Sequence, residues 1–214
     1  FSSDAEHELR TPLAALMIHA ENILEDNQDT ALDASIINIK KSINRLSHLV
    51  AQLLSLSRAD TQLIADDFTE INMVKTVEQV VADFSHLAEQ KEQSLLYVVS
   101  NADDKVFSIK GNKALIYNML CNVVMNAIKY SPEQSSITVT LDCAHKKITI
   151  EDSGPGIVTA LRERVKDRFY RAPGAIGEGS GLGLAIVNRI ASIHQIDWQL
   201  SEAKTGGLAV EFKL

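Results

Sequence analysis

The sequence predicts an α+β protein in which a two-helix hairpin, forming a dimeric four-helix bundle, precedes an α/β sandwich. Three observations support this fold class. Apolar residues recur at helical spacing in two segments near the start, and later segments alternate with the period of strands. A glycine-rich stretch then interrupts the second half of the chain. We expect two domains, a helical hairpin at 1–62 and a larger domain at 63–214.

The two helices of the hairpin each carry a single apolar stripe. The first stripe has spacings of four and three, at Leu9, Leu13, Leu16, Ala20 and Ile23. After the polar stretch 25–33, the second stripe contains Ile36, Ile39, Ile43, Leu46, Val50 and Leu53. Two such helices cannot enclose a core, so we expect a homodimer whose two hairpins form the bundle. The alternative is a pair of core helices in a monomer.

The larger domain is predicted to be a mixed sheet with helices on one face. The predicted helices are 72–91, 112–130 and 182–194, and the predicted strands are 94–100, 105–109, a hairpin within 135–152, 198–203 and 208–214. The connection 153–181 is longer than a compact domain usually tolerates without a function. Because it is also rich in glycine, we interpret it as a lid.

Composition narrows the function classes. A net charge of −7 and a pI near 5.4 argue against a broad nucleic-acid-binding surface. Cys121 and Cys143 have no second pair at metal spacing, so we interpret them as reduced core thiols. No apolar run reaches eighteen residues. We expect the sequence to be part of a longer protein, attached to a membrane only through segments upstream of Phe1.

Polar and glycine motifs in the larger domain point to a nucleotide. Asn122 and Asn126 are four residues apart and share one helix face, where two amide oxygens can hold a hard cation. If this helix stood alone, a pair of surface or capping asparagines would be the preferred interpretation. The run "GEGSGLGLAIV" leads glycines into a helix, an arrangement that suits phosphate oxygens. It lacks the Lys-Ser/Thr of a P-loop, and its glycines do not fit a dinucleotide fingerprint.

Taken in order, these motifs resemble those of the bacterial sensor histidine kinases over nearly the whole chain. "HELRTP" resembles the H box, "NVVMNAIKYS" the N box, "DSGPG" the first G box, "RFYR" the F box, "GSGLGL" the second G box and "TGGLAVEF" a third. The opening "FSSDAEHELRTPLAAL" is most similar to the quorum- and polymyxin-sensor subgroup. The resemblance implies the cytoplasmic kinase core of an inner-membrane protein, with an ATPase sandwich of the GHKL type.

The resemblance also implies roles for individual residues. Asn122 and Asn126 would hold Mg²⁺ against ATP, Lys129 and Arg171 would contact phosphate oxygens, Tyr130 would line the base pocket and Asp152 would accept the adenine amino group. A tyrosine that simply closes the helix end is an alternative for Tyr130. The remaining nucleotide contacts would come from Gly154, Gly156, Gly179, Gly181, Leu182 and Gly183.

His7 is the predicted phosphoryl acceptor. Glu8 can fix the imidazole tautomer so that the other ring nitrogen presents a lone pair to the γ-phosphoryl group. Thr11 lies one turn further on the same face, where its hydroxyl could orient a water for a phosphatase reaction; a hydroxyl that bonds back to its own helix is the alternative. The other histidines are interpreted as structural.

The resulting prediction is an ATP-dependent protein histidine kinase that phosphorylates His7 and passes the group to an aspartate of a response regulator receiver domain. Two other classes remain open. One is an ATP-driven conformational machine of the gyrase, Hsp90 and MutL kind, which hydrolyses ATP without a phosphohistidine. The other is a dimerising scaffold that binds nucleotide without catalysis.

Overall fold

The computed structural model describes residues 68–100, 107–173, 181–204 and 206–214, together with nine residues of the N-terminal hairpin: 17, 18, 20, 21, 36, 37, 39, 40 and 43. The chain divides into two compact units, Phe1–Asp60 and Thr61–Leu214. None of the helices within the described ranges is both long and apolar enough to cross a bilayer.

In the first unit, all nine described residues are helical. The Lys40 ammonium lies 2.7 Å from Glu21 Oε1, which ties the second helical segment to the first. Ala20, Ile36 and Ile43 of the predicted stripes are buried. Ile39 belongs to the same predicted stripe, yet 52% of its surface is exposed in the single chain.

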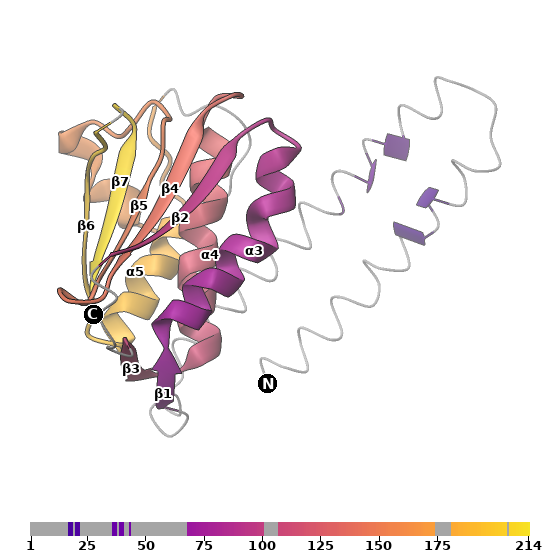
Figure 1. The fold of residues 1–214 in the computed structure, drawn as a ribbon. Coiled ribbons are helices and arrows are strands. Elements are labelled where there is room, and N and C mark those ends of the chain that lie inside the picture. The colour runs from indigo at the N-terminus through magenta and orange to yellow at the C-terminus, as the bar shows by residue number, and fades with distance from the viewer. Residues whose placement is uncertain are drawn as a thin grey trace. The chain divides into compact units, whose positions relative to one another are not determined.

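The second unit is built around a five-stranded mixed sheet (Figure 1). Its strand order is β2 (Ser94–Ser100), β4 (Ser136–Asp142), β5 (Lys147–Glu151), β7 (Leu208–Lys213) and β6 (Asp197–Glu202). The first pair is parallel and the others are antiparallel. Strand β4 alternates buried and half-buried residues, because Ile137, Val139 and Leu141 point into the core.

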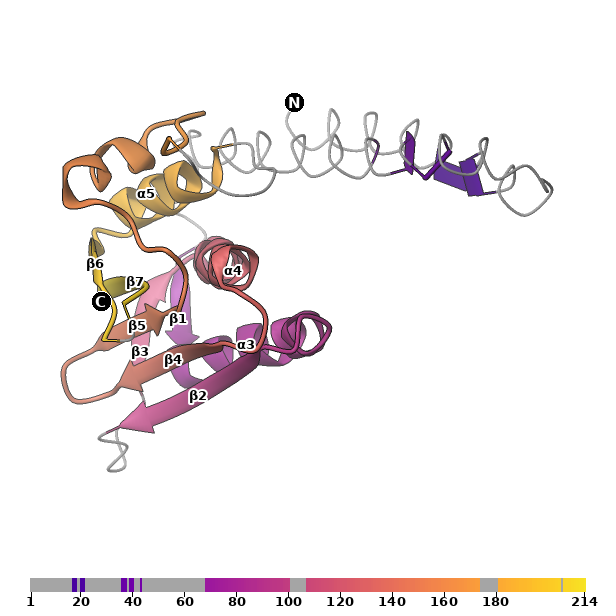
Figure 2. The ribbon, with the colours of Figure 1, turned by 90° about the horizontal axis from the view of Figure 1, so that it is seen from above.

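Three helices cover one face of this sheet, as predicted (Figure 2). They are α3 (Met73–Glu89), α4 (Lys113–Tyr130) and α5 (Gly183–Ile193). Asparagine caps start the first two, since the Asn72 and Asn112 side chains accept from the backbone N–H three residues later. The core between helices and sheet includes Met119, Leu120 and Phe212, none of them more than 1% exposed.

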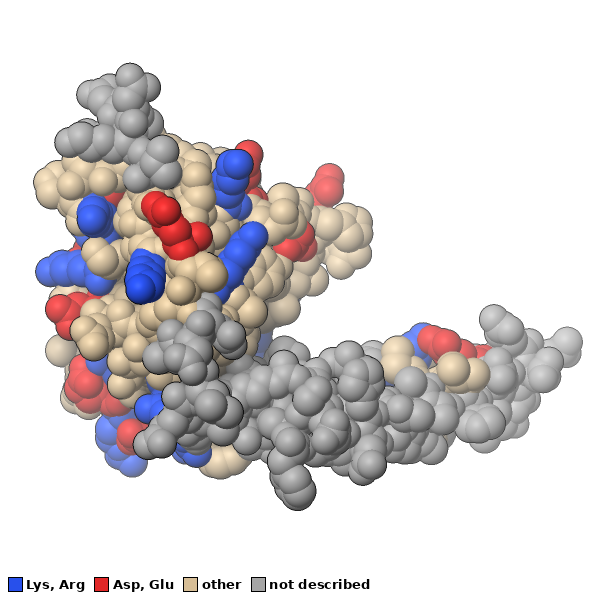
Figure 3. Space-filling view, turned by 90° about the horizontal axis from the view of Figure 1, so that it is seen from below, with Lys and Arg blue, Asp and Glu red and all other residues tan. Residues whose placement is uncertain are grey.

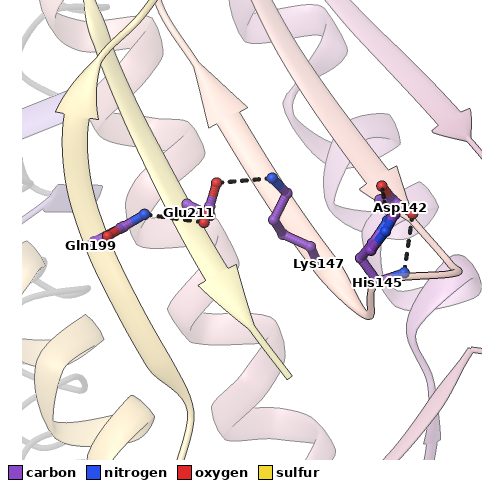
Figure 4. A network of polar contacts seen from close by, with 5 residues as sticks. All are labelled: Asp142, His145, Lys147, Gln199 and Glu211. Atoms are coloured by element: carbon purple, nitrogen blue, oxygen red, sulfur yellow. Dashed lines mark hydrogen bonds and ion pairs between the residues drawn. The ribbon is translucent and has the colours of Figure 1, made fainter.

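The opposite face of the sheet carries a network of polar side chains on β4 to β6 (Figure 4). Glu211 accepts from Lys147 Nζ at 3.0 Å and from Gln199 Nε2 at 3.1 Å, which links three neighbouring strands. At the β4–β5 turn, His145 Nδ1 lies 2.9 Å from Asp142 Oδ2. The described helices therefore cover only one face of the sheet.

A second, two-stranded sheet differs from the sequence prediction. Strand β3 (Ser108–Gly111) continues two residues beyond the predicted 105–109 and pairs antiparallel with β1 (Thr69–Asn72) instead of joining the main sheet. Strand β1 was not predicted, and its last residue was assigned to the following helix. His194 packs beside this small sheet: its Nε2 accepts from Asn112 N at 3.0 Å and its Nδ1 donates to Ile190 O at 2.8 Å. Its position fits the structural interpretation.

Candidate functional site

The first turn of α5 faces the two asparagines of α4. A Cβ placed on Gly183, the first residue of α5, would lie 3.4 Å from Asn126 Nδ2, 3.5 Å from Asn122 Oδ1 and 3.6 Å from Asn126 Oδ1. Because residue 183 is glycine, the start of the helix approaches both amides without a side chain between them. The structure thus brings together two segments that are about sixty residues apart in the sequence.

A neighbouring side chain orients the Asn122 amide. Asn122 Nδ2 donates to the Asn118 carbonyl at 2.8 Å and to Asn118 Oδ1 at 2.9 Å. With the NH₂ group engaged on its own helix, Oδ1 is the atom that turns toward Gly183. The α5 N-terminus adds the positive end of the helix dipole, so the arrangement combines amide oxygens with backbone N–H groups.

Asp152 follows β5 and is held by backbone donors. Only 7% of its surface is exposed. Its Oδ1 accepts from Gly154 N at 2.8 Å and from Leu208 N at 3.0 Å. Burial raises the pKa of the Asp152 carboxyl above its ordinary value, and these N–H donors oppose the rise in part. A fixed, buried acceptor of this kind is suited to recognising a hydrogen-bond donor.

Glycines on two sides make room for this carboxylate. A Cβ on Gly154 would lie 3.0 Å from Asp152 Oδ1 and 3.0 Å from the Tyr130 carbonyl, so the end of α4 abuts the Asp152 turn. Gly156 adopts a φ of +67°. A Cβ on Gly207 would collide with the Asp152 carbonyl. Gly207 was not among the predicted site residues. The sequence signal that could have identified it is the "GG" pair before the last strand.

Lys129 and Tyr130 occupy the last turn of α4. The Lys129 ammonium lies 5.1 Å from the centroid of the Tyr130 ring, and both side chains are half-buried. The structure therefore places a cation and an aromatic ring at the same helix end that contacts the Asp152 turn.

The connection after Gly156 is compact where the structure describes it. It contains two short 3-10 helices, Thr159–Leu161 and Arg164–Lys166, and residues 174–180 of the predicted lid lie outside the described residues. Its cations have nearby partners: Arg164 lies over the Tyr170 ring at 4.5 Å, and Lys166 pairs with Glu163 at 2.9 Å. Basic and acidic side chains are interspersed across the described surface visible in Figure 3.

Phe169 and Gly181, which flank residues 170–180 of this connection, contact each other. Phe169 N donates to Gly181 O at 3.0 Å, and both residues have positive φ. A Cβ on Gly181 would lie 2.6 Å from the Phe169 carbonyl carbon. Arg171 follows on the surface.

Other predicted site residues are placed differently or lie outside the described part. Leu182 is fully buried, so only its backbone could reach a ligand. His7, Glu8, Thr11 and Gly179 lie outside the described residues. Within the described ranges, no group of three or more His, Cys, Asp or Glu side chains could hold a metal ion. Any divalent cation at this site would depend on the amide oxygens and on a ligand's own oxygens.

Comparison with known proteins gives matches over both units. Residues 1–62 match the His Kinase A (phospho-acceptor) domain, and residues 111–214 match the Histidine kinase-, DNA gyrase B-, and HSP90-like ATPase. The chain is 37% identical over 208 residues to the sensor protein QseC of Salmonella typhi, covering 97% of this chain and 45% of that protein. It is 32% identical over 196 residues to the sensor protein kinase PmrB of Pseudomonas aeruginosa, covering 90% of this chain and 40% of that protein.

Solved structures agree with these matches. The cytoplasmic segment of histidine kinase QseC superposes with a TM-score of 0.56 at 28% identity, covering 79% of this chain and 92% of that chain. The present chain spans less than half the length of the two curated relatives.

Proposed function

Because this chain belongs to the sensor histidine kinase family, we propose that it phosphorylates its own His7 from ATP and passes the phosphoryl group to a response regulator. In the first step, one imidazole nitrogen attacks the γ-phosphorus. The bond between that phosphorus and the β–γ bridging oxygen breaks, ADP leaves and a phosphoramidate forms. In the second step, an aspartate of the receiver domain takes the group.

The observation that carries this proposal is the meeting of Gly183 with Asn122 and Asn126. It supports a triphosphate bound between the N-terminus of α5 and the polar face of α4. Lys129 and Arg171 contact phosphate oxygens in this proposal. Asp152 accepts the adenine amino group and Tyr130 lines the base pocket. The same carboxylate would face an oxygen acceptor in guanine, which disfavours GTP.

Mg²⁺ fits the chemistry of this donor set. The side-chain oxygens of Asn122 and Asn126 would hold it, with water and phosphate oxygens completing its preferred octahedron. When bound, it neutralises charge on the phosphates. The orientation of the Asn122 amide, with its NH₂ group bonded to Asn118, supports an outward-facing oxygen.

In this proposal, three residues of the first unit take part in phosphoryl transfer and hydrolysis. His7 is the nucleophile, and Glu8 accepts the proton of the other ring nitrogen, which fixes the tautomer. Thr11 orients a water against the regulator's aspartyl phosphate, giving a phosphatase activity. These roles rest on the match of residues 1–62 to the phospho-acceptor domain and on the "HELRTP" motif.

The proposed assembly is a homodimer on the cytoplasmic side of the inner membrane, anchored by segments outside this sequence. The half-exposed Ile39 supports the dimer, because an isoleucine in an apolar stripe is expected to pack against another helix. The receiver domain of a response regulator is the second partner. The acidic net charge gives no support to nucleic-acid binding.

The direct test is incubation with γ-labelled ATP and Mg²⁺, followed by acid and base treatment of the protein. We expect a label that acid removes and base does not, and its transfer to at least one of a panel of purified receiver domains. Free phosphate released without protein labelling would instead indicate an ATP-driven machine.

Replacing Gly181 by alanine is expected to weaken ATP binding more than about tenfold, equivalent to about 1.4 kcal/mol. The added Cβ would meet the Phe169 backbone, and alanine also disfavours the φ of +71°. Gly206→Ala is a matched control, because its φ is +89° but an added Cβ would have nothing within 4 Å. Calorimetric titration of both variants gives the Kd for ATP. Equal losses of affinity in the two would show that ATP binding does not depend on the close approach of residue 181 to Phe169.

A further inference from the structure

Helix α4 ends at Tyr130 in a way that leaves its last carbonyls dependent on other parts of the chain. Ser131 is extended, with φ −77° and ψ 145°, and its N–H donates to the Ala127 carbonyl at 3.0 Å. Pro132 follows and has no N–H to donate. The carbonyls from Ile128 onward therefore need donors from outside the helix.

Two side chains from the turn between α3 and β2 supply these donors. Lys91 Nζ donates to the carbonyls of Ile128 at 2.9 Å and Lys129 at 3.4 Å. Gln93 Nε2 lies within hydrogen-bonding distance of three carbonyls, those of Ile128 at 3.1 Å, Ser131 at 2.9 Å and Pro132 at 3.0 Å. The Lys91 charge also lies at the negative end of the α4 dipole, where a cation is favoured.

The turn that carries these two residues is itself fixed. Gln93 N donates to the Ala88 carbonyl at 2.9 Å and Glu92 N donates to the Glu89 carbonyl at 2.8 Å, the two bonds of a Schellman motif. Glu92 takes the left-handed position with φ 56°. Because the backbone is closed in this way, Lys91 and Gln93 are directed at α4 from a rigid base.

Burying the Gln93 side chain at this position costs folding free energy. Only 6% of its surface is exposed, and its Oε1 is buried without a hydrogen-bond partner among the described residues. Burying an amide whose oxygen has no hydrogen bond destabilises the fold, whereas an apolar side chain of similar size carries no such penalty. This cost favours a role beyond filling the core.

The carbonyls held by this turn lie next to the candidate nucleotide site. Lys129 and Tyr130 are the last two residues of α4. The Tyr130 carbonyl faces Gly154, whose N–H donates to Asp152 Oδ1. A displacement of the α4 end would therefore move a proposed phosphate contact, a proposed base contact and the Asp152 turn together.

We propose that Lys91 and Gln93 are positioning residues that hold the end of α4, and with it Lys129 and Tyr130, in the geometry that ATP binding requires. The inference rests on the proposed function for the identity of the nucleotide. Neither residue touches ATP; each acts through the main-chain carbonyls of α4.

The test uses the full chain and compares Gln93→Met and Lys91→Met with the control Gln90→Met. Gln90 is exposed and lies in the same turn, and its side-chain amide bonds to His86 of its own helix at 3.0 Å. Calorimetry gives the Kd for ATP at a temperature where each variant is fully folded, and labelling over a range of ATP concentrations gives KM and kcat. A Lys91→Arg variant tests rescue by a second cation.

We expect Gln93→Met to raise both Kd and KM for ATP about tenfold, which corresponds to the loss of about one hydrogen bond, with kcat within about twofold of the wild type. Lys91→Met raises Kd and KM in the same direction, Lys91→Arg restores them, and Gln90→Met leaves them unchanged. A folded Gln93→Met protein with a lower Tm but an unaltered Kd would overturn the proposal. Wild-type protein that binds ATP without labelling His7 would overturn the proposed kinase reaction instead, leaving the Kd comparison intact.

Discussion

Replacing Asp152 by asparagine is expected to weaken ATP binding by about 100-fold or more while leaving the fold intact. The backbone N–H groups of Gly154 and Leu208 both donate to the same oxygen, Oδ1. An asparagine can keep that oxygen in place and change only the other one, from an acceptor to an NH₂ donor. That donor would face the adenine amino group, which is also a donor. Calorimetric titration with ATP measures the loss.

The same substitution is expected to preserve or raise thermal stability at neutral pH. Because burial raises the pKa of Asp152, the folded protein holds this proton more tightly than the unfolded chain does, and the wild type loses stability as the pH rises from the ordinary pKa through the folded one. The variant has no carboxyl to ionise there. Its Tm advantage over the wild type is therefore expected to be largest above the raised folded pKa and to shrink as the pH falls from that value toward the ordinary pKa of an aspartate.

Melting curves of both proteins across this pH range separate recognition from folding. If the variant lost ATP binding together with its cooperative melting transition, the carboxylate would be a structural residue. A folded variant that bound ATP with unaltered affinity would remove Asp152 from base recognition.

The sequence was sufficient to predict the main elements of the second unit, because most of them carry a clear signal. The hairpin of β4 and β5 alternates strictly, and α4 begins after a capping asparagine and ends before Pro132. Strand β1 has no such signal. It has four residues, and its last, Asn72, caps the next helix, so its strand and helix-start signals overlap.

The limits of the site prediction have a different cause. Asn122, Asn126, Asp152 and Gly183 could be selected from motifs, but the contact between α4 and α5 depends on tertiary packing. Gly207 was missed because its constraint, the Asp152 carbonyl that an added Cβ would meet, lies 55 residues away in the sequence. Lys91 and Gln93 look like ordinary polar turn residues, and only the structure connects them with the end of α4.

Replacing His7 by glutamine is expected to abolish protein labelling from γ-labelled ATP completely, with the Kd for ATP within about twofold of the wild type. Glutamine is close in size but has no basic nitrogen, so it cannot attack the γ-phosphorus. All the nucleotide contacts proposed above belong to the second unit, and for that reason binding should persist. Labelling and calorimetry on the same preparation measure the two effects separately.

A His19→Gln protein is the matched control, because it makes the same chemical change in the same predicted helix at a histidine interpreted as structural. It is expected to label normally. Asp152→Asn should label weakly because it binds less ATP, whereas His7→Gln should not label at all because it has no acceptor. Acid-labile label persisting on His7→Gln would place the phosphoryl group on another histidine, and the role assigned to "HELRTP" would be wrong. Normal binding with no label on the wild type or either histidine variant would favour the ATP-driven machine.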